Sequence, residues 1–246
     1  MIKRTLYFGN PAYLSTENRQ LVIRLPDKCG SGNAVTKSIP IEDIGVVVLD
    51  NRQITITQAA LESLSENASA VIVCDSTHHP VSLQLPLDGN TLQSERFAAQ
   101  IRASLPLKKQ LWQQTIQCKI RNQAMVLSSI RNCETGNMIA WSSQVKSGDS
   151  DNLEARAAAY YWRNMFPSVP DFTRDRYGCQ PNNLLNYGYA ILRAVVARAL
   201  VVNGLLPTLG IHHHNRYNAY CLADDIMEPY RPFVDALVAV SYTHLR

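Results

Sequence analysis

Ile44-Gly45-Val46-Val47-Val48-Leu49 is a continuous run of six apolar residues. A run this short and this rich in β-branched residues predicts a strand that is buried on both faces. Turn residues separate four further strand-like segments that precede it. These segments are residues 4–8, 12–15, 20–25 and 34–40. We expect an N-terminal β-domain built as an antiparallel, sandwich-like sheet.

The predicted secondary structure changes from mostly strand to mostly helix near residue 90. A short helix at residues 57–65 and a strand at 69–74 still belong to the first part, but good helix formers dominate beyond it. The predicted fold class is therefore α+β, with a small β-domain over residues 1–90 and a larger all-α domain over residues 91–246.

Four helices are expected in the second part. Asp151 precedes one of them and is the predicted capping acid, while Gly204 and Pro207 end another. The expected helices are residues 91–130, residues 153–159, a core helix from residue 182 to Gly204, and residues 217–227.

Composition excludes several protein classes. Hydrophobic residues make up 46% of the chain and charged residues 18%, which predicts a packed core rather than disorder. The most apolar run, residues 194–202, is interrupted by Arg198, so we expect no membrane span. The six cysteines form no CxxC pair, which argues against a zinc ribbon and predicts free thiols in the cytoplasm.

Positive charge is concentrated in one segment. Residues 91–131 hold seven lysines and arginines and a single acid, Glu95, while the whole chain has a net charge of only +4. Such a face binds a polyanion through counterion release, although a solvated helix face has the same composition. The predicted DNA contacts are Arg96, Arg102, Lys108, Lys109, Lys119 and Arg121, with Arg174 and Arg176 as further candidates.

Two short segments carry residues suited to catalysis. His212, His213 and His214 place half of the six histidines together, and because consecutive side chains point in different directions we expect one of them to act. Glu154 stands in the second turn of an alanine-rich helix, where it is either a surface acid or the acid of a crevice.

A second group of acids follows the histidines. On the helix expected at residues 217–227, Asp224, Asp225 and Glu228 share a face, which costs stability unless a cation joins them. Arg231 is one such cation, and a divalent ion is the other. Imidazole and carboxylate ligands without a thiolate favour Mg²⁺ or Mn²⁺, which stabilise charge in phosphodiester chemistry.

Three stretches of the chain resemble the CRISPR-associated spacer-acquisition integrases (the "Cas-one" family), in their type II branch. The first is residues 39–50 with 71–75, and the second is residues 152–162 with 182–190. The third is residues 209–215 with 222–232. They occur in the order typical of the family and extend over most of the chain.

The resemblance implies a metal-dependent DNA endonuclease that joins 3′-hydroxyl ends of short DNA into a repeat array by transesterification. It places the family's metal ligands at Glu154, His213 and Glu228, with His212 or His214 as alternatives and Asp225 as a substitute acid. It also implies a homodimer that assembles with the small "Cas-two" protein, with double-stranded DNA and with the type II effector nuclease.

The end of the chain departs from the family pattern. Residues 233–238 still fit, but residues 241–246 do not, and family members usually continue for some tens of residues. We therefore expect a truncated helical domain that exposes apolar surface.

Two other functions compete with an integrase. A DNA-binding scaffold of the same complex would keep the basic segment without turnover, but it has no need of clustered carboxylates. A hydrolase of small phosphoesters would use the acids, but it has no need of an extended basic segment.

Overall fold

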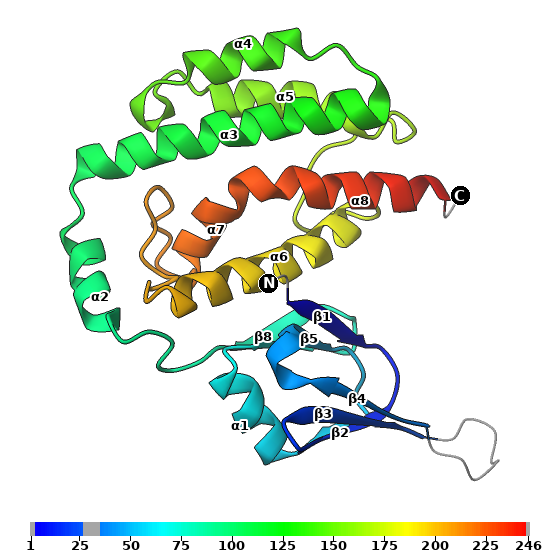
Figure 1. Ribbon diagram of the computed structural model, residues 1–246. Helices are drawn as coiled ribbons and strands as arrows, with labels where there is room; N and C mark the ends of the chain where they lie inside the picture. The colour runs from blue at the N-terminus through cyan, green and yellow to red at the C-terminus, as the bar shows by residue number, and fades with distance from the viewer. Residues whose placement is uncertain (1–2, 27–34, 245–246) are drawn as a thin grey trace. The chain divides into compact units, whose positions relative to one another are not determined.

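The computed structural model describes residues 3–26 and 35–244, and it divides into two compact units (Figure 1). Unit 1 comprises residues 1–94 and 197–205, and unit 2 comprises residues 95–196 and 206–246. The predicted α+β class is confirmed, because the strands lie in unit 1 and unit 2 is helical. The described residues do not include Cys29, residues 245–246 or Ala34, which is the first residue of the strand expected at 34–40.

The described part of unit 1 contains two four-stranded sheets. The first contains β1 (Arg4–Phe8), β5 (Ile44–Leu49), β7 (Ala70–Cys74) and β8 (Pro80–Gln84), in that order. The second contains β4 (Val35–Pro40), β3 (Gln20–Leu25), β2 (Ala12–Glu17) and β6 (Ile54–Ile56). A single turn of 3₁₀ helix, η1 (Ile41–Asp43), leads into β5.

Both sheets are mixed, so the expected antiparallel pairing is only partly right. β5 pairs in parallel with β1 and with β7, and β2 pairs in parallel with β6. The remaining pairs are antiparallel. Parallel neighbours need a crossover connection, which the second sheet supplies between β1 and β5 and the helix α1 (Gln58–Glu66) supplies between β5 and β7.

One hydrophobic core joins the two sheets of unit 1. Leu14 and Leu21 from the second sheet and Ile44 and Val47 from the first belong to it, and all four are fully buried. Leu64 of α1 completes it. Every residue of β5 is buried, which confirms the strand predicted from the apolar run.

Unit 2 is built around the long helix α3 (Leu105–Arg131). Figure 1 shows α4 (Gly136–Gln144) and α5 (Leu153–Met165) along one side of α3 and α8 (Arg231–His244) along the other. The remaining elements are α2 (Gln93–Arg102), η2 (Ser147–Asp149), α6 (Asn182–Val202), α7 (Cys221–Met227) and η3 (Glu228–Tyr230). The last residues of α6 group with unit 1.

Two helix predictions need correction. The helix expected at 91–130 is divided, because Ser104 caps a new helix by accepting the Leu107 N–H and Pro106 occupies the first turn of α3. The helix expected at 217–227 begins only at Cys221, and the residues before it form turns.

The helix α6 is long and apolar enough to cross a membrane by length and composition alone. It also carries Arg193, whose Nε lies 2.6 Å from Oδ1 of the buried acid Asp224. A charged side chain paired within the unit is typical of a core helix in a globular protein.

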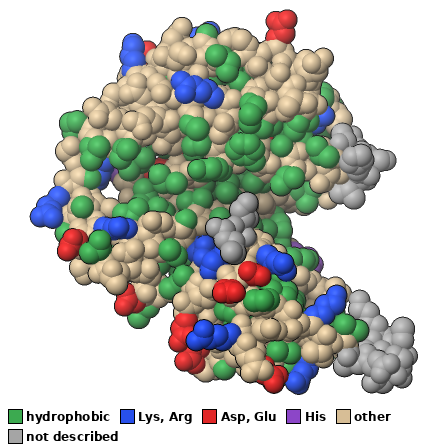
Figure 2. Space-filling model, viewed as in Figure 1, with side chains coloured by type: hydrophobic (Ala, Val, Ile, Leu, Met, Phe, Trp, Pro, Cys, Tyr) green, Lys and Arg blue, Asp and Glu red, His purple; other side chains and the backbone are tan. Residues whose placement is uncertain are grey.

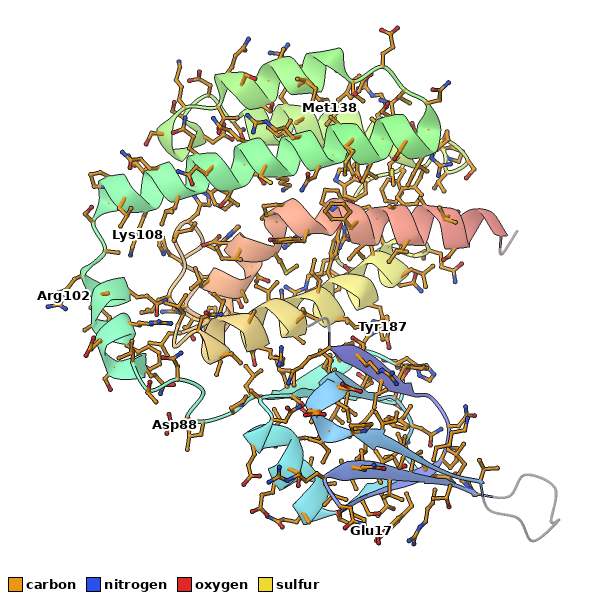
Figure 3. All side chains as sticks on the ribbon, in the orientation of Figure 1. Glu17, Asp88, Arg102, Lys108, Met138 and Tyr187 are labelled. Carbon is orange, nitrogen blue, oxygen red and sulfur yellow. The ribbon has the colours of Figure 1, made fainter. Side chains whose placement is uncertain are left out.

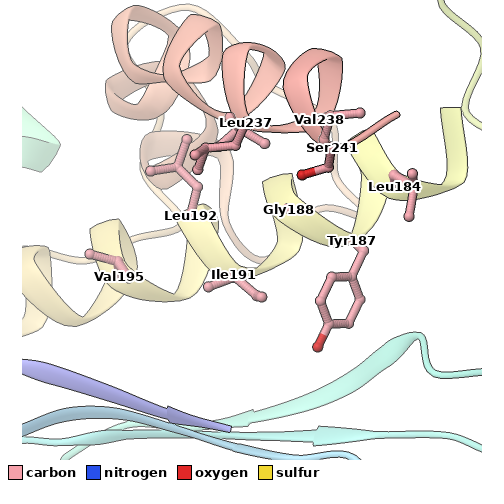
Figure 4. A pocket seen from close by; sticks show the side chains of 10 residues that line it. Leu184, Tyr187, Gly188, Ile191, Leu192, Val195, Leu237, Val238 and Ser241 are labelled. Atoms are coloured by element: carbon pink, nitrogen blue, oxygen red, sulfur yellow. The ribbon is translucent and has the colours of Figure 1, made fainter. Parts of the chain in front are cut away.

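An apolar groove of about 420 Å³ lies between α6 and α8 (Figure 4). Ile191 and Leu192 line it from α6, and Leu237 and Val238 line it from α8. Gly188 lets the helices approach closely, because a Cβ atom there would overlap Val234. Figure 2 shows further apolar side chains on the surface of unit 2.

Candidate active site

Two of the predicted ligands meet around a single cation in unit 2. Glu154 lies in the first turn of α5, and Glu228 is the first residue of η3. The ammonium nitrogen of Lys119, on α3, lies 2.6 Å from Oε1 of Glu154 and 2.6 Å from Oε2 of Glu228. Two acids far apart in the chain therefore share one positive charge.

The position of Glu154 depends on how α5 begins. The carboxylate of Asp149 accepts hydrogen bonds from the first two backbone N–H groups of α5, both at 3.0 Å. The prediction that Asp151 caps this helix is wrong, because its carboxylate pairs with Lys146 at 2.7 Å. Because α5 begins at Leu153, Glu154 lies in its first turn rather than the second, and the helix dipole there favours an anion.

Glu228 lies between two cations. Its Oε1 is 3.1 Å from Nη2 of Arg231, so the arginine proposed from the sequence as its partner is present beside Lys119. The Arg231 guanidinium also lies over the ring of Tyr189, 4.9 Å from the centroid. Burial lowers the pKa of Lys119, but the charges of Glu228 and Glu154 outweigh it and raise the pKa overall. The same balance raises the pKa of Arg231, so both cations stay charged.

His213 is held by Asp225 rather than by the two glutamates. Its Nδ1 lies 2.5 Å from Oδ1 of Asp225. Oδ2 of Asp225 also accepts the backbone N–H groups of Ile211 and His212, at 2.8 and 2.9 Å. The hydrogen bond to Asp225 raises the pKa of His213 against the effect of burial. With Nδ1 engaged, Nε2 is the ring nitrogen left to bind an ion.

The three histidines have different surroundings. The His212 ring stacks on Trp112 with centroids 4.0 Å apart and planes 3° apart. The same indole meets His213 edge-on at 5.7 Å. His214 is exposed. Burial lowers the pKa of His212. This packing favours His213 as the histidine that acts, because Trp112 covers a face of His212.

The other two acids of the cluster have partners of their own. Asp224 pairs with Arg193 and accepts a hydrogen bond from Asn218 at 2.7 Å. Asp225 is fully buried and bonded to the histidine loop. The structure therefore separates the sequence cluster, placing Glu228 beside Glu154 and Asp225 beside His213.

Two of the predicted ligands suit a divalent cation. Among the described residues, no three His, Cys, Asp or Glu side chains lie close enough together to hold a metal ion. The space between Glu154 and Glu228 does accept a cation, because the Lys119 nitrogen lies within 2.6 Å of both. Two carboxylates match the ligands that Mg²⁺ and Mn²⁺ prefer. These two acids fit the ion, whereas His213 completes the set only by moving closer.

The predicted DNA contacts fall into three groups. Lys119 was expected to be exposed and to contact DNA. Its side chain is instead only 12% exposed and pairs with the two glutamates. Arg174 is occupied within the fold, where its guanidinium donates to Asn182 and Asn186 at 3.0 and 2.5 Å. The exposed members are Arg102, Lys109, Arg121 and Arg176, while Arg96 and Lys108 are half-buried.

The exposed cations are not gathered into one patch in the view shown. In Figure 2 the lysine and arginine side chains of unit 2 are dispersed among apolar and neutral ones. Figure 3 labels Arg102 at the end of α2 and Lys108 in the first turns of α3. The basic segment is therefore spread over two helices.

The role of Lys119 was missed in the sequence. The signal lies in its spacing on α3, because Ile116 precedes it by three residues, Gln123 follows it by four, and both are buried. A lysine on the buried stripe of a helix requires an acid opposite it.

The chain resembles known proteins over nearly its whole length. The family model "CRISPR associated protein Cas1" matches residues 6–244. The CRISPR-associated endonuclease Cas1 of Neisseria meningitidis serogroup C (strain 8013) is 39% identical over 248 residues, covering 98% of this chain and 77% of that protein.

Two solved structures share the fold of this chain. A casposase bound to integration product has a TM-score of 0.75 at 22% identity, covering 98% of this chain and 72% of that one. A Cas6-RT-Cas1–Cas2 complex has a TM-score of 0.70 at 23% identity, covering 99% of this chain and 28% of that one. The family match extends over both units, and this chain belongs to the Cas1 family of CRISPR-associated proteins.

Proposed function

We propose that this chain is a divalent-metal-dependent DNA endonuclease and integrase that inserts short DNA fragments into a CRISPR array. The observation that carries the proposal is the convergence of Glu154 and Glu228 on one cation in unit 2. The names of its relatives support it, since one is called an endonuclease and another is bound to integration product.

The proposed reaction is a transesterification. The 3′-hydroxyl oxygen of the incoming fragment forms a bond to a phosphorus atom of the repeat, and the bond from that phosphorus to its own 3′-oxygen breaks. A bound Mg²⁺ or Mn²⁺ supplies stabilisation of the charge that develops on the phosphate. Glu154 and Glu228 would hold the ion through carboxylate oxygens, and His213 would join them through Nε2.

Asp225 serves as a positioning residue in this proposal. Its carboxylate fixes the His213 ring through Nδ1 and the loop backbone through two N–H groups. Carboxylates that bind the second nitrogen of a ligating histidine orient the ring and strengthen it as a donor. Asp225 is therefore a weaker choice than Glu228 for the acid that holds the ion.

DNA is the proposed substrate, held mainly through phosphate contacts. Cations on α2 and α3 supply the charge together with Arg176, which precedes α6. Lys119 and Arg174 are left out of this role because both are paired within the fold. We propose contacts from Arg96, Arg102, Lys108, Lys109, Arg121 and Arg176.

The proposed partners follow the family. We propose a homodimer that acts with the small Cas2 protein, and the name of one structural neighbour, a Cas1–Cas2 complex, supports this. The Neisseria relative is compatible with the type II branch, and the type II effector nuclease would then be a further partner. Action in the cytoplasm without a membrane is also proposed, and the five described cysteines, all free, are consistent with it.

A non-catalytic DNA-binding scaffold is the second candidate. The ion pairs of Lys119 favour it, because in this arrangement the acids are neutralised without a metal ion. The scaffold would bind DNA with the same affinity after Glu154 is replaced and would transfer no strand.

A strand-transfer assay tests the proposal. The chain and the Cas2 protein would be mixed with a short 3′-hydroxyl duplex and a supercoiled repeat-bearing plasmid, with Mn²⁺ or with EDTA. Joining that requires Mn²⁺ and is lost in Glu154→Gln supports the integrase. DNA binding without joining in the wild type would instead establish the scaffold.

A further inference from the structure

Lys119 is the cation on which the two acids of the proposed site converge, and it is almost enclosed. The exposed side-chain fractions are 12% for Lys119, 27% for Glu154 and 6% for Glu228. Two carboxylates at this burial repel each other unless a cation lies between them. Lys119 therefore satisfies, in the metal-free chain, the charge requirement that a divalent ion would satisfy in the active protein.

The acids are positioned independently of Lys119. Asp149 fixes the start of α5, and so the backbone of Glu154, through two N–H groups. The η3 turn is fixed to α3 by the Asn122 side chain, which donates to the Pro229 carbonyl at 2.7 Å. Both glutamates can therefore stay in place if the ammonium leaves.

Lys119 and Arg231 differ in how firmly they are held. The guanidinium of Arg231 bonds Glu228 and also lies over Tyr189, so one of its contacts does not depend on the glutamates. Both ion pairs of Lys119 are with the two glutamates themselves. The ammonium of Lys119 is a compact charge at the end of a flexible four-carbon chain. Of the two cations, Lys119 is the one that can move.

The balance of charge in the site indicates when the Lys119 ammonium moves. Glu154 and Glu228 are neutralised by Lys119 and Arg231, one negative charge for each positive one. Adding a divalent ion with both cations in place would leave two uncompensated positive charges in a mostly buried site, which is costly. Departure of the ammonium reduces that excess and frees an oxygen of each glutamate.

We infer that Lys119 is a tethered cation that occupies the space between Glu154 and Glu228 in the metal-free protein and is displaced when a divalent ion binds. This inference rests on the proposed function of the site. It assigns to Lys119 a competition with the metal ion, in place of the DNA contact expected from its position in the basic segment.

Calorimetric titration of the whole chain with Mn²⁺, without DNA, tests the competition. Lys119→Met removes the ammonium and keeps the length of the side chain. We expect Lys119→Met to bind Mn²⁺ at least about 10-fold more tightly than the wild type, to unfold at a lower temperature without metal, and to gain more in Tm when Mn²⁺ is added. Equal or weaker Mn²⁺ binding by Lys119→Met would overturn the inference.

Two matched variants complete the titration. Lys146→Met breaks a lysine–carboxylate pair that is exposed, with side-chain fractions of 67% and 45%, and should leave Mn²⁺ affinity unchanged. Glu154→Gln should lose Mn²⁺ binding. Absence of Mn²⁺ binding in the wild type would count against the proposed function, whereas wild-type binding that Lys119→Met does not strengthen counts against this inference alone.

Chemical labelling of the wild type provides a test that does not depend on the folding of a variant. Acetic anhydride modifies free amines, and mass spectrometry reads each lysine separately. Labelling of Lys119 should be low without metal and should rise several-fold with Mn²⁺, while Lys146 stays constant. A Lys119 signal that Mn²⁺ leaves unchanged would show that the ammonium does not move.

Discussion

The imidazole Nδ1 of His213 lies 2.5 Å from Oδ1 of Asp225, a residue twelve positions later in the chain. The same carboxylate accepts the N–H groups of Ile211 and His212, so one buried acid organises both the ring and the backbone of the loop. Burial strengthens this arrangement, because Asp225 is completely inaccessible to solvent and cannot exchange these bonds for water.

Replacement of Asp225 by asparagine should lower activity without removing a proposed ligand. An amide is neutral and has only one oxygen, so it cannot accept all the hydrogen bonds that the Asp225 carboxylate accepts. The His213 ring then loses its fixed orientation. We expect strand transfer and Mn²⁺ affinity to fall by about 10–100-fold, the usual effect of losing such a partner. Asp151→Asn, an exposed acid near α5, is the control. Unchanged Mn²⁺ affinity in Asp225→Asn would contradict the positioning role.

The three histidines should differ sharply when each is replaced by alanine. His213→Ala is expected to reduce strand transfer by at least about 100-fold, because it removes a proposed ligand and the partner of Asp225. His214→Ala should keep nearly full activity, since Asp225 holds the ring of His213 and not that of His214. His212→Ala should lower Tm by uncovering Trp112, with a smaller effect on turnover. Loss of activity in His214→Ala but not His213→Ala would reassign the ligand.

Gly210→Ala should destabilise the histidine loop. A Cβ atom at Gly210 would overlap the backbone carbonyl of His213 and come within 3.0 Å of Oδ2 of Asp225. The backbone oxygen cannot move away without breaking the loop, so we expect a loss of about 1–3 kcal/mol. Denaturant unfolding measures it. Gly136→Ala is the control, because nothing lies within 4 Å of its added Cβ.

Asp235 should make the stability of unit 2 dependent on pH. Burial raises its pKa from 3.8 to about 7, against the hydrogen bonds of Tyr189 and Tyr161 and the charges of Arg231 and Lys119. The folded state then retains a proton that the unfolded chain loses, so the free energy of unfolding falls as pH rises from about 4 to 7 and levels off above. At about 1.4 kcal/mol per pKa unit, this contribution reaches at most about 4 kcal/mol.

Asp235→Asn tests this assignment, because the amide does not titrate. The difference in free energy of unfolding between variant and wild type should shift in favour of the variant as pH rises from 4 to 7. Denaturant melts at several pH values measure it. A difference that stays constant over this range would show that Asp235 does not carry the expected proton.

Local patterns were enough to predict much of the fold. The apolar run at β5 identified a buried strand, because a stretch that is apolar on both faces can only lie in a core. The turn residues that separate the strand-like segments likewise gave the bounds of β1 and β3. Strand pairing was predicted only in part, because the parallel pairs were not expected. Parallel pairing depends on how the chain crosses over, and this is a property of the whole sheet.

The helices α4 and α8 were not predicted, and the starts of the predicted helices were less accurate than their positions in the chain. Thr57, Ser104 and Asp149 stand before helices with side chains that accept backbone N–H groups, yet Asp151 was the acid predicted to cap α5. Both acids precede that helix, and which one turns toward it depends on the backbone between them.

The sequence by itself determined the fold class and the chemical character of the site, because apolar periodicity and the grouping of acids and histidines are local properties of the chain. Tertiary structure decided the partners. It joined Glu154 to Glu228 through Lys119, and it separated Asp225 from Glu228 although they are neighbours in sequence. Charged groups take buried partners according to distance in space, and packing of α3 against α5 and η3 sets that distance.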